Sequence, residues 1–498
     1  MIDKKLKQKL LLEKISDIFI FVYILIFPLL INSKGYFDIL GFKWSAYVII
    51  TLTYLLCNIS IFLYYLIRYR INFFKEIHIS KTIKIIMILL FIMYISYFLS
   101  PFKEHYNLIL GEGRYEGLFI NTLYLLMFLN ICAFSKFKKR YILYFLISSI
   151  LVNSITVMQY FGLNPLGLYK HNHNISFMTT FGNVDTVSAF SCITFPISLF
   201  SYIYIKDNKY KNLSIISLII NIMSIIIIDV KGGKLAIICM LIILLPILIL
   251  KSENLSKLLT VLSITLFDYL IYNSFFPKYN DSITNITYTF NLGLDKILAV
   301  IIVLILLYLS KKVKKLEFDY FNKNNIKKIY ISIFVLFLTF MIVLFIFDFN
   351  FSFLHDIHKI LHFDFDDKLG SYRIFLWKRT LKLVTDYPII GTGLDSFVIR
   401  FMNSYTKDLI DAGIPSINDT AANVYLTMLI NLGFTGLITY LLYIFEQIKN
   451  GLKSRNIYSK ILLAAFICFV IQDFFNFSVV IVTPIFWTMG AIFYKSIN

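Results

Sequence analysis

Apolar runs of membrane-spanning length recur along the whole chain, and this feature limits the fold more than any other. A helix needs about 20 consecutive apolar residues to cross the hydrocarbon core of a bilayer. Helices are favoured over a barrel because barrel strands alternate over about ten residues, and these runs do not alternate. The sequence predicts fourteen spanning helices, at 16–32, 44–66, 85–100, 117–135, 141–161, 182–204, 213–230, 235–250, 258–276, 292–310, 329–348, 421–446, 459–475 and 477–494.

The overall composition agrees with a chain surrounded by lipid. It is 58% hydrophobic and 15% charged, whereas soluble domains are about 45–50% apolar and about 25% charged. A water-soluble fold cannot bury this much apolar surface, so the excess is expected to face lipid. The composition therefore excludes secreted, disordered and fibrous proteins.

The positive charge of the chain gives an orientation. The net charge is +19, from 48 Lys and Arg against 29 Asp and Glu, and taken alone it would suit a nucleic-acid partner. However, 31 of the 48 basic residues fall in one alternate set of loops, which includes both termini. Because cytoplasmic loops collect Lys and Arg, we predict that both termini are cytoplasmic and that no nucleic acid is bound.

Residues 349–420 form the only large segment predicted on the outer side. They comprise 72 residues with 8 Lys or Arg, 9 Asp and three His, and loops of this length are usually functional. Residues 372–384 have helical periodicity, with Phe375 and Leu376 on the apolar face, and a second amphipathic piece follows around Phe397. Two roles stay open: the helices lie in the membrane interface, or they cap a cavity that opens outward.

These patterns predict an all-α membrane bundle of about 14 transmembrane helices (12–14) with one large, partly helical external loop. We divide the chain into an N-terminal membrane bundle of about 11 spans (1–348), the extracytoplasmic loop (349–420) and about three C-terminal spans (421–498).

One motif in the loop resembles a known family. Arg373 and Trp377 precede the turn Pro388-Ile389-Ile390-Gly391-Thr392-Gly393, which is followed by Phe397. This order resembles the R…W…P-(hydrophobic)2-G-x-G-x3-F signature of the O-antigen ligase family. That family includes lipopolysaccharide O-antigen ligases and related surface-polysaccharide polymerases.

Four further motifs occur in the order that this family has, and the charge count places all of them on the outer side. The resemblance covers roughly residues 110–490. The motifs resemble R-x-x-G-L, T-F-G-N, T-G-S-R-G-A and H-N-x-Y-L with a trailing G-x-x-G-L. Here they read Gly113-Arg114-Tyr115-Glu116-Gly117-Leu118, Thr180-Phe181-Gly182-Asn183, Lys231-Gly232-Gly233-Lys234-Leu235-Ala236, and Asn423-x-Tyr425-Leu426 with Gly433-Phe434-Thr435-Gly436-Leu437.

The resemblance implies a membrane glycosyltransferase of bacterial surface-polysaccharide assembly. Its donor would be a glycan on undecaprenyl pyrophosphate, its acceptor a glycan or lipid hydroxyl, and its place the outer face of the cytoplasmic membrane. We expect neither a metal nor a cofactor, because fixed cations can stabilise a pyrophosphate leaving group. The predicted catalytic residues are Arg373, Lys234 and Asn423, and the predicted substrate-binding residues are Arg114, Trp377, Asn183, Gly391 and Gly393.

Two positions depart from the family pattern. Lys234 stands where the family usually has Arg, and lysine lacks the bidentate fork that grips phosphate oxygens. Ala422 stands where the family has a His that is proposed to assist the attacking hydroxyl. The chain therefore resembles a polymerase or divergent transferase more than a ligase, and no general base is assigned. Asp419 is read as the N-cap of the next helix or as a base.

Other interpretations of the same residues stay open. Arginines near a membrane edge often only extend to lipid headgroups, and Trp377 would equally pack the loop helix onto the bundle. Asn423 would hold an acceptor hydroxyl or satisfy a helix contact. His355, His358 and His362 share one helix face, but they are favoured as polar loop residues over metal ligands. At the level of function, the alternatives are a lipid-linked-oligosaccharide flippase without transferase chemistry and a sensor or scaffold.

Overall fold

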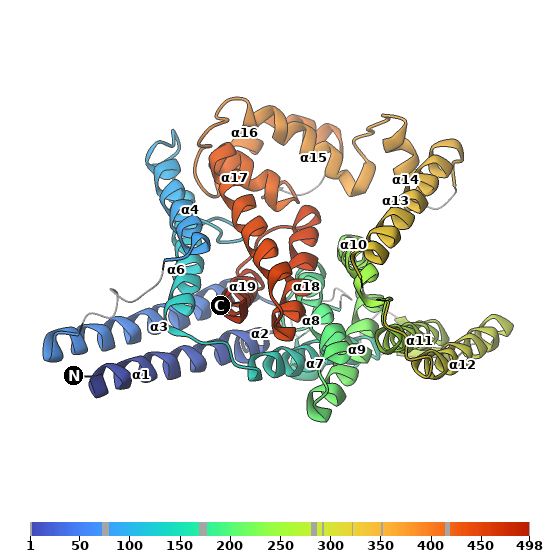
Figure 1. Ribbon diagram of the computed structural model, residues 1–498. Coiled ribbons are helices and arrows are strands. Elements are labelled where there is room, and N and C mark those ends of the chain that lie inside the picture. Colours follow the sequence, from blue (N-terminus) through green and yellow to red (C-terminus); the bar gives the residue numbers. More distant parts are fainter. Residues whose placement is uncertain are drawn as a thin grey trace.

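The structure is a computed structural model that describes residues 2–71, 79–168, 177–279, 286–290, 293–320, 322–349, 352–413 and 419–497. It is helical almost throughout (Figure 1). The N-terminal part contains α1 (Ile2–Phe21), the π-helical turn η1 (Val22–Ile26), α2 (Phe27–Leu29), α3 (Ile39–Tyr69), α4 (Lys81–Phe98), α5 (Asn107–Leu110), α6 (Leu118–Phe134), α7 (Arg140–Tyr160), the 3-10 turn η3 (Pro165–Gly167), α8 (Val184–Tyr204) and α9 (Asn208–Ile228).

The C-terminal part contains α10 (Lys231–Leu248), α11 (Ser252–Ser274), β1 (Phe275–Tyr279), β2 (Ile286–Phe290), α12 (Leu294–Lys314), α13 (Lys323–Ile346), α14 (Ser352–Leu361), α15 (Leu369–Val384), α16 (Ser396–Asp411), α17 (Val424–Lys453), α18 (Ile457–Gln472), the 3-10 turn η4 (Asp473–Phe475) and α19 (Thr483–Ile497). The two strands pair antiparallel, with Phe275 opposite Phe290. This strand pair is the exception to the predicted all-helical class.

Ten helices among the described residues are long and apolar enough to cross a membrane. The chain is therefore a multi-pass membrane protein, as the composition predicts, although the count of fourteen is not reached. Two of the predicted spans do not qualify because their helices are short: α6 has 17 residues and α19 has 15. A third predicted span, α12, does not qualify because it carries charged residues at both ends: Asp295 and Lys296 at one end and several lysines at the other.

The first apolar run is one continuous helical segment with a π-helical turn inside it, and it ends at Leu29, before the end of the span predicted at 16–32. The chain passes from α1 through a π-helical turn into α2, which ends at Leu29 ahead of an extended residue. The freed carbonyl oxygen of Pro28 accepts hydrogen bonds from Lys43 Nζ at 3.0 Å and Thr180 Oγ1 at 2.6 Å. Side chains from α3 and from the T-F-G-N motif thus satisfy a carbonyl oxygen at the end of this helical segment.

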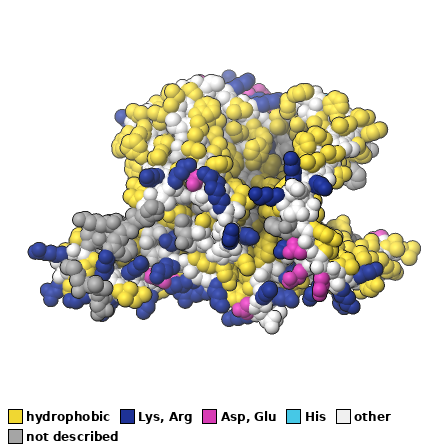
Figure 2. Space-filling model, in the orientation of Figure 1, with side chains coloured by type: hydrophobic (Ala, Val, Ile, Leu, Met, Phe, Trp, Pro, Cys, Tyr) yellow, Lys and Arg dark blue, Asp and Glu magenta, His cyan; other side chains and the backbone are white. Residues whose placement is uncertain are grey.

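Figure 1 shows how the helices divide the molecule. Helices α4, α6 and α17 stand upright, α1 and α3 run beside each other below them, and α11 and α12 form a hairpin at one side. Helix α8 lies inside, in contact with α9 and α18. Figure 2 shows Lys and Arg concentrated along the lower part of this face, below broad hydrophobic areas.

The segment 349–420 folds largely into helices, as its periodicity predicts. Its three helices are α14, α15 and α16, and the last two lie across the end of α17 (Figure 1). Phe375 and Leu376 of α15 are buried together with Phe397 and Phe401 of α16 and with residues of α17. The apolar faces of this segment therefore pack against each other and against a spanning helix.

Candidate functional site

Three motif segments meet at the short connection between α18 and α19. Arg373 Nη1 donates to the carbonyl oxygens of Phe475 at 2.5 Å and Ala422 at 3.1 Å. The guanidinium carbon of Arg114 lies 3.3 Å from the centre of the Phe477 ring. Gly232 packs so closely that an added Cβ would lie 2.8 Å from Phe475 Cβ. Segments far apart in the sequence thus share one neighbour, residues 475–477.

The two arginines of this site flank an acidic side chain. Asp185, in the first turn of α8, interacts electrostatically with both Arg373 and Arg114. Arg114 Nε also donates to Asp419 Oδ2 at 2.7 Å. Burial lowers the pKa of Arg373, and Asp185 opposes this shift, yet a guanidinium stays charged at neutral pH. The site therefore holds two fixed positive charges close to the end of α8.

Lys234 is less directly involved than the other two motif cations. Its Nζ is paired with Asp229, which lies at the turn between α9 and α10. The glycines beside it have a packing role, because a Cβ on Gly233 would overlap Ser188 Oγ at 1.9 Å. The catalytic role of Lys234 stays a prediction.

Both predicted site asparagines are helix N-caps. Asn423 Oδ1 accepts from Leu426 N at 3.0 Å at the start of α17, and Asn183 Oδ1 accepts from Asp185 N at 2.7 Å at the start of α8. Asparagine is among the preferred residues at this position. Asn423, and not Asp419, therefore caps α17, which corrects one reading of Asp419. Both asparagines fix helix ends next to the arginines.

Trp377 attaches the loop helix to the bundle, in agreement with the packing interpretation given above. Its Nε1 donates to the carbonyl oxygen of Ala421 at 3.0 Å, and its ring meets Phe474 edge-on at 5.3 Å. Arg373, one turn earlier on α15, binds the next carbonyl, that of Ala422. The spacing of Arg373 and Trp377 thus positions α15 against the segment that precedes α17.

The glycine turn after α15 is hydrogen-bonded to a break in α17. The backbone N–H groups of Thr392 and Gly393 donate to the carbonyl oxygen of Asn431, at 3.1 and 2.9 Å. In return, Phe434 N donates to the carbonyl oxygen of Pro388 at 2.8 Å. Two motifs that look independent in the sequence therefore form one contact.

Only glycine fits where these two segments cross. Gly391 has φ +70°, and an added Cβ would lie 2.4 Å from the Asn431 carbonyl oxygen. Gly433 interrupts α17 with φ +65°, and an added Cβ would lie 2.3 Å from a carbonyl oxygen of the facing turn. We call residues 388–393 and 431–435 together the backbone clasp.

Two serine side chains at the end of α4 also form hydrogen bonds to the backbone clasp. Ser96 Oγ in α4 donates to the Asn431 carbonyl oxygen at 3.0 Å, and Ser100 Oγ donates to the Thr392 carbonyl oxygen at 2.5 Å. The clasp therefore joins α4, α17 and the segment between α15 and α16. Gly391 and Gly393, predicted to bind substrate, are placed here by close packing.

A small cavity of about 60 Å³ lies beside Arg114, and three carboxyl groups line it. They belong to Glu116, Asp395 and Asp419, which come from three different segments. Burial raises the pKa of Asp395 to about 7 and that of Glu116 to about 8. Sequence reasoning missed Glu116 and Asp395, although both stand inside motifs quoted above.

The three histidines of the loop lie on or just beyond α14, as their spacing predicts. The Nδ1 atom of each imidazole ring forms a hydrogen bond to a nearby residue. The partners are Asp348 for His355 at 2.7 Å, the Leu344 carbonyl oxygen for His358 at 2.7 Å, and the His358 carbonyl oxygen for His362 at 2.9 Å. Within the described part of the chain, no three His, Cys, Asp or Glu residues are grouped so as to hold a metal ion.

The fold and site define a multi-pass membrane protein with a helical segment packed over its last spans. The sequence model of the O-antigen ligase family matches residues 289–441. This match confirms the resemblance to the O-antigen ligase family, and it contains Arg373, Trp377, the backbone clasp and Asn423. No curated protein matches the chain significantly.

Proposed function

We propose that this protein is a membrane glycosyltransferase that transfers or polymerises a glycan for cell-surface polysaccharide assembly. Its donor is a glycan linked to undecaprenyl pyrophosphate, and its acceptor is a glycan or lipid hydroxyl. The observation that carries the proposal is the meeting of Arg114 and Arg373 at residues 475–477. The meeting of two family motifs, each of which brings a guanidinium to the same place, supports a shared anionic ligand.

The arginine pair suits a pyrophosphate leaving group. Arg373 uses Nη1 for the two carbonyl oxygens, while its Nε and Nη2 have no hydrogen-bond partner within the described residues. Those groups are free to donate to phosphate oxygens, and charge-assisted bonds of this kind are strong in a desolvated site. We assign Arg373 to the leaving group and Arg114 to donor binding. Lys234 and Asn423 stay predicted catalytic residues, and Trp377, Asn183, Gly391 and Gly393 stay predicted substrate-binding residues.

We place the site on the outer face of the bacterial cytoplasmic membrane, with both termini cytoplasmic and residues 349–420 outside. Support comes from the basic residues, of which 31 of 48 fall in the opposite set of loops. The position of α15 and α16 at one end of the molecule agrees with this placement (Figure 1).

The proposal is tested by complementing a deletion strain and analysing lipid-linked and surface glycans by mass spectrometry. Arg373→Ala should lower transfer by about 10²–10³-fold, because one charge-stabilising donor has this effect in other enzymes. Lys382→Ala, on the exposed face of the same helix, is the matched control and should transfer normally. Full glycan with Arg373→Ala would contradict the proposal.

The same experiment separates the two reaction types. Loss of long chains with single units retained indicates a polymerase, whereas long chains left on the lipid carrier indicate a ligase. Transport of the lipid-linked glycan in liposomes without any new bond would favour the flippase alternative.

A further inference from the structure

We propose that Asp395 is the general base of the transfer, and that its carboxylate takes the proton of the acceptor hydroxyl. This inference rests on the proposed function. It answers a question that the sequence leaves open, because Ala422 occupies the position of the family histidine. A hydroxyl attacks a glycosyl donor efficiently only when a positioned group accepts its proton.

The position of Asp395 fits this role. It follows the backbone clasp directly and precedes α16, so its main chain is held by packed elements. The residue is 8% exposed and lines the cavity beside Arg114. Its Oδ2 accepts a hydrogen bond from the backbone N–H of Glu112 at 2.6 Å. Its Oδ1 has no hydrogen-bond partner among the described residues, and this oxygen is available to a hydroxyl in the cavity.

The backbone conformation alone does not account for an aspartate here. Asp395 has φ +62°, a region that Asp, Asn and Gly enter more readily than other residues. An asparagine would adopt this conformation and accept the same bond from Glu112 without burying a charge. Burying a carboxylate is costly, and such groups concentrate at functional sites.

The surrounding charges keep Asp395 ready to accept a proton near neutral pH. Burial raises its pKa to about 7, the hydrogen bond from the Glu112 backbone N–H opposes this, the charges of Asp419 and Glu112 raise the pKa further, and Arg114 lowers it. Glu116, on the wall of the same cavity, accepts a hydrogen bond from the Tyr124 hydroxyl at 2.8 Å and has a pKa of about 8. Both carboxyls of this cavity thus have pKa values raised into the range in which catalytic acids and bases work.

The oxygen of the acceptor hydroxyl forms a bond to the anomeric carbon of the donor glycan. The bond from that carbon to the pyrophosphate oxygen breaks, and its electron pair leaves with the lipid pyrophosphate beside Arg373. The hydroxyl proton moves to Asp395 Oδ1 and later to water. The cavity of about 60 Å³ beside Arg114 has room for the hydroxyl group of the acceptor and a few water molecules.

The test uses the full chain in proteoliposomes, with lipid-linked glycan extracted from the deletion strain as the probe. The rate of its consumption is measured from pH 5 to pH 9. Asp395→Asn should lower kcat by about 10²–10⁴-fold with little change in KM. It should also remove the rise in kcat/KM through about pH 7 that the wild type shows. Asp411→Asn, at the exposed far end of α16, is the matched control and should keep both.

The possible failures are distinguishable. If the wild type consumes no donor, the proposed function falls and the base assignment falls with it. If the wild type is active and Asp395→Asn has the same kcat and pH profile, the base assignment alone is wrong. Asp395→Gly, which also accepts the left-handed backbone, must lose rate as well, and thermal unfolding must show that both variants are folded. Arg373→Ala should be slow but retain the rise with pH.

Discussion

Helices α8 and α13 are both apolar enough to span a membrane, yet they have opposite environments. The apolar stretch of α8 is 100% buried in the protein, and that of α13 is 6% buried. The buried helix is the more polar of the two, and its small polar residues are Thr186, Ser188, Ser191, Thr194, Ser198 and Ser201. Water would favour the reverse arrangement, so the comparison indicates that lipid surrounds α13.

The polar side chains of the inner helices bind one another. Asn221 Nδ2 in α9 donates to Ser149 Oγ at 2.7 Å and to Thr194 Oγ1 at 2.9 Å, and the hydroxyls of Ser198 and Ser217 lie 2.6 Å apart. The candidate site lies at the end of the same inner helices, next to the N-terminus of α8. The inner region therefore has specific partners that hold the site in place.

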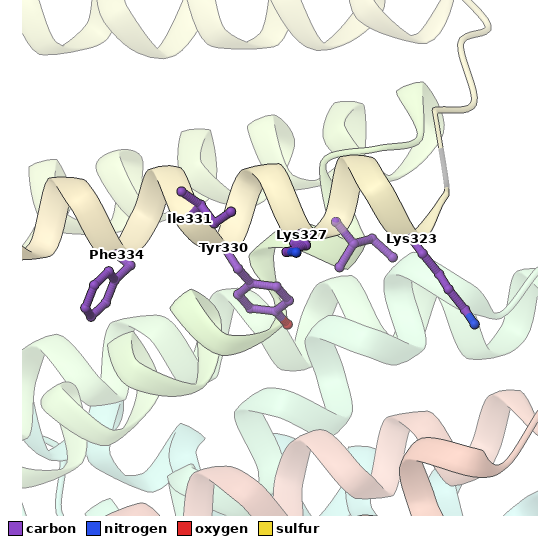
Figure 3. A pocket seen from close by; sticks show the side chains of 6 residues that line it. Lys323, Lys327, Tyr330, Ile331 and Phe334 are labelled. Carbon is purple, nitrogen blue, oxygen red and sulfur yellow. The ribbon is translucent and has the colours of Figure 1, made fainter.

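The outer region has few such partners. Figure 3 shows Tyr330 pointing from α13, and its hydroxyl donates to the Ile243 carbonyl oxygen of α10 at 2.8 Å. The surface hollow in this view is lined by residues of α13 alone, which range from Lys323 to Phe334. It is an open helix face, whereas the cavity beside Arg114 is lined by residues of several segments.

The largest expected effect comes from breaking the inner contacts at the backbone clasp. Gly433→Val places a branched side chain at φ +65°, against a carbonyl oxygen 2.3 Å from its Cβ. We expect a loss of more than about 4 kcal/mol, since overlap is added to the strain of a left-handed residue. The measurement is the yield of folded protein in detergent, together with transfer activity.

The control for this change is Gly413→Ala. Gly413 also has positive φ (+66°), but an added Cβ would meet nothing within 4 Å. It should cost only the conformational strain of about 1–2 kcal/mol. Equal losses at both positions would show that the clasp contributes no more than backbone strain.

A charged residue introduced into α13 tests whether lipid surrounds this helix. Leu336, near the middle of α13, is 68% exposed. If lipid surrounds it, Leu336→Lys should cost about 2.5–3.5 kcal/mol of insertion free energy. Leu316→Lys, in the turn after α12 and 61% exposed, should be tolerated. An insertion assay in microsomes measures both, and equal insertion would mean that α13 does not face lipid.

The sequence predicts the helical class, most of the spans, the loop helices and the order of the motifs. These follow from run length, periodicity and local residue types, which are properties of short segments. The end of the first helical segment at Leu29 was missed because it depends on Lys43 and Thr180, which are distant in sequence and bind the Pro28 carbonyl oxygen. The predicted spans 459–475 and 477–494 assign no special role to residues 475–477, since only tertiary packing shows that Arg114 and Arg373 meet there.

The backbone clasp and the cavity were hidden for related reasons. The clasp consists largely of main-chain hydrogen bonds and close glycine contacts. Because any residue type can form main-chain hydrogen bonds, the sequence does not indicate which two segments pair. Asp395 and Glu116 are ordinary acids in the sequence, and only burial distinguishes them from the exposed acids of the loop. A missing base together with acids inside the motifs was a signal that could have identified them.

The buried charge at Asp395 should weaken the fold in a pH-dependent way. Its pKa is raised from 3.8 to about 7 in the folded state, so the folded protein holds a proton that the unfolded chain releases between these values. Stability should therefore fall as the pH rises from about 4 to about 7. Asp395→Asn removes this cost, and its stabilisation should grow from little at pH 4 to about 4 kcal/mol at pH 8. Thermal unfolding in detergent at both pH values, with Asp411→Asn as the unaffected control, measures the difference.

The smallest effect concerns the polar contacts between inner helices. Asn221→Ala removes two hydrogen bonds between buried side chains, and such bonds in membranes contribute roughly 0.6 kcal/mol each. We expect a loss of about 1 kcal/mol. Thr339→Val on α13, whose hydroxyl donates only to the Val335 carbonyl oxygen of its own helix, should change stability by less than about 0.5 kcal/mol. Unfolding in mixed detergent compares the two variants, and an equal response would mean that α8 and α9 are held by apolar packing alone.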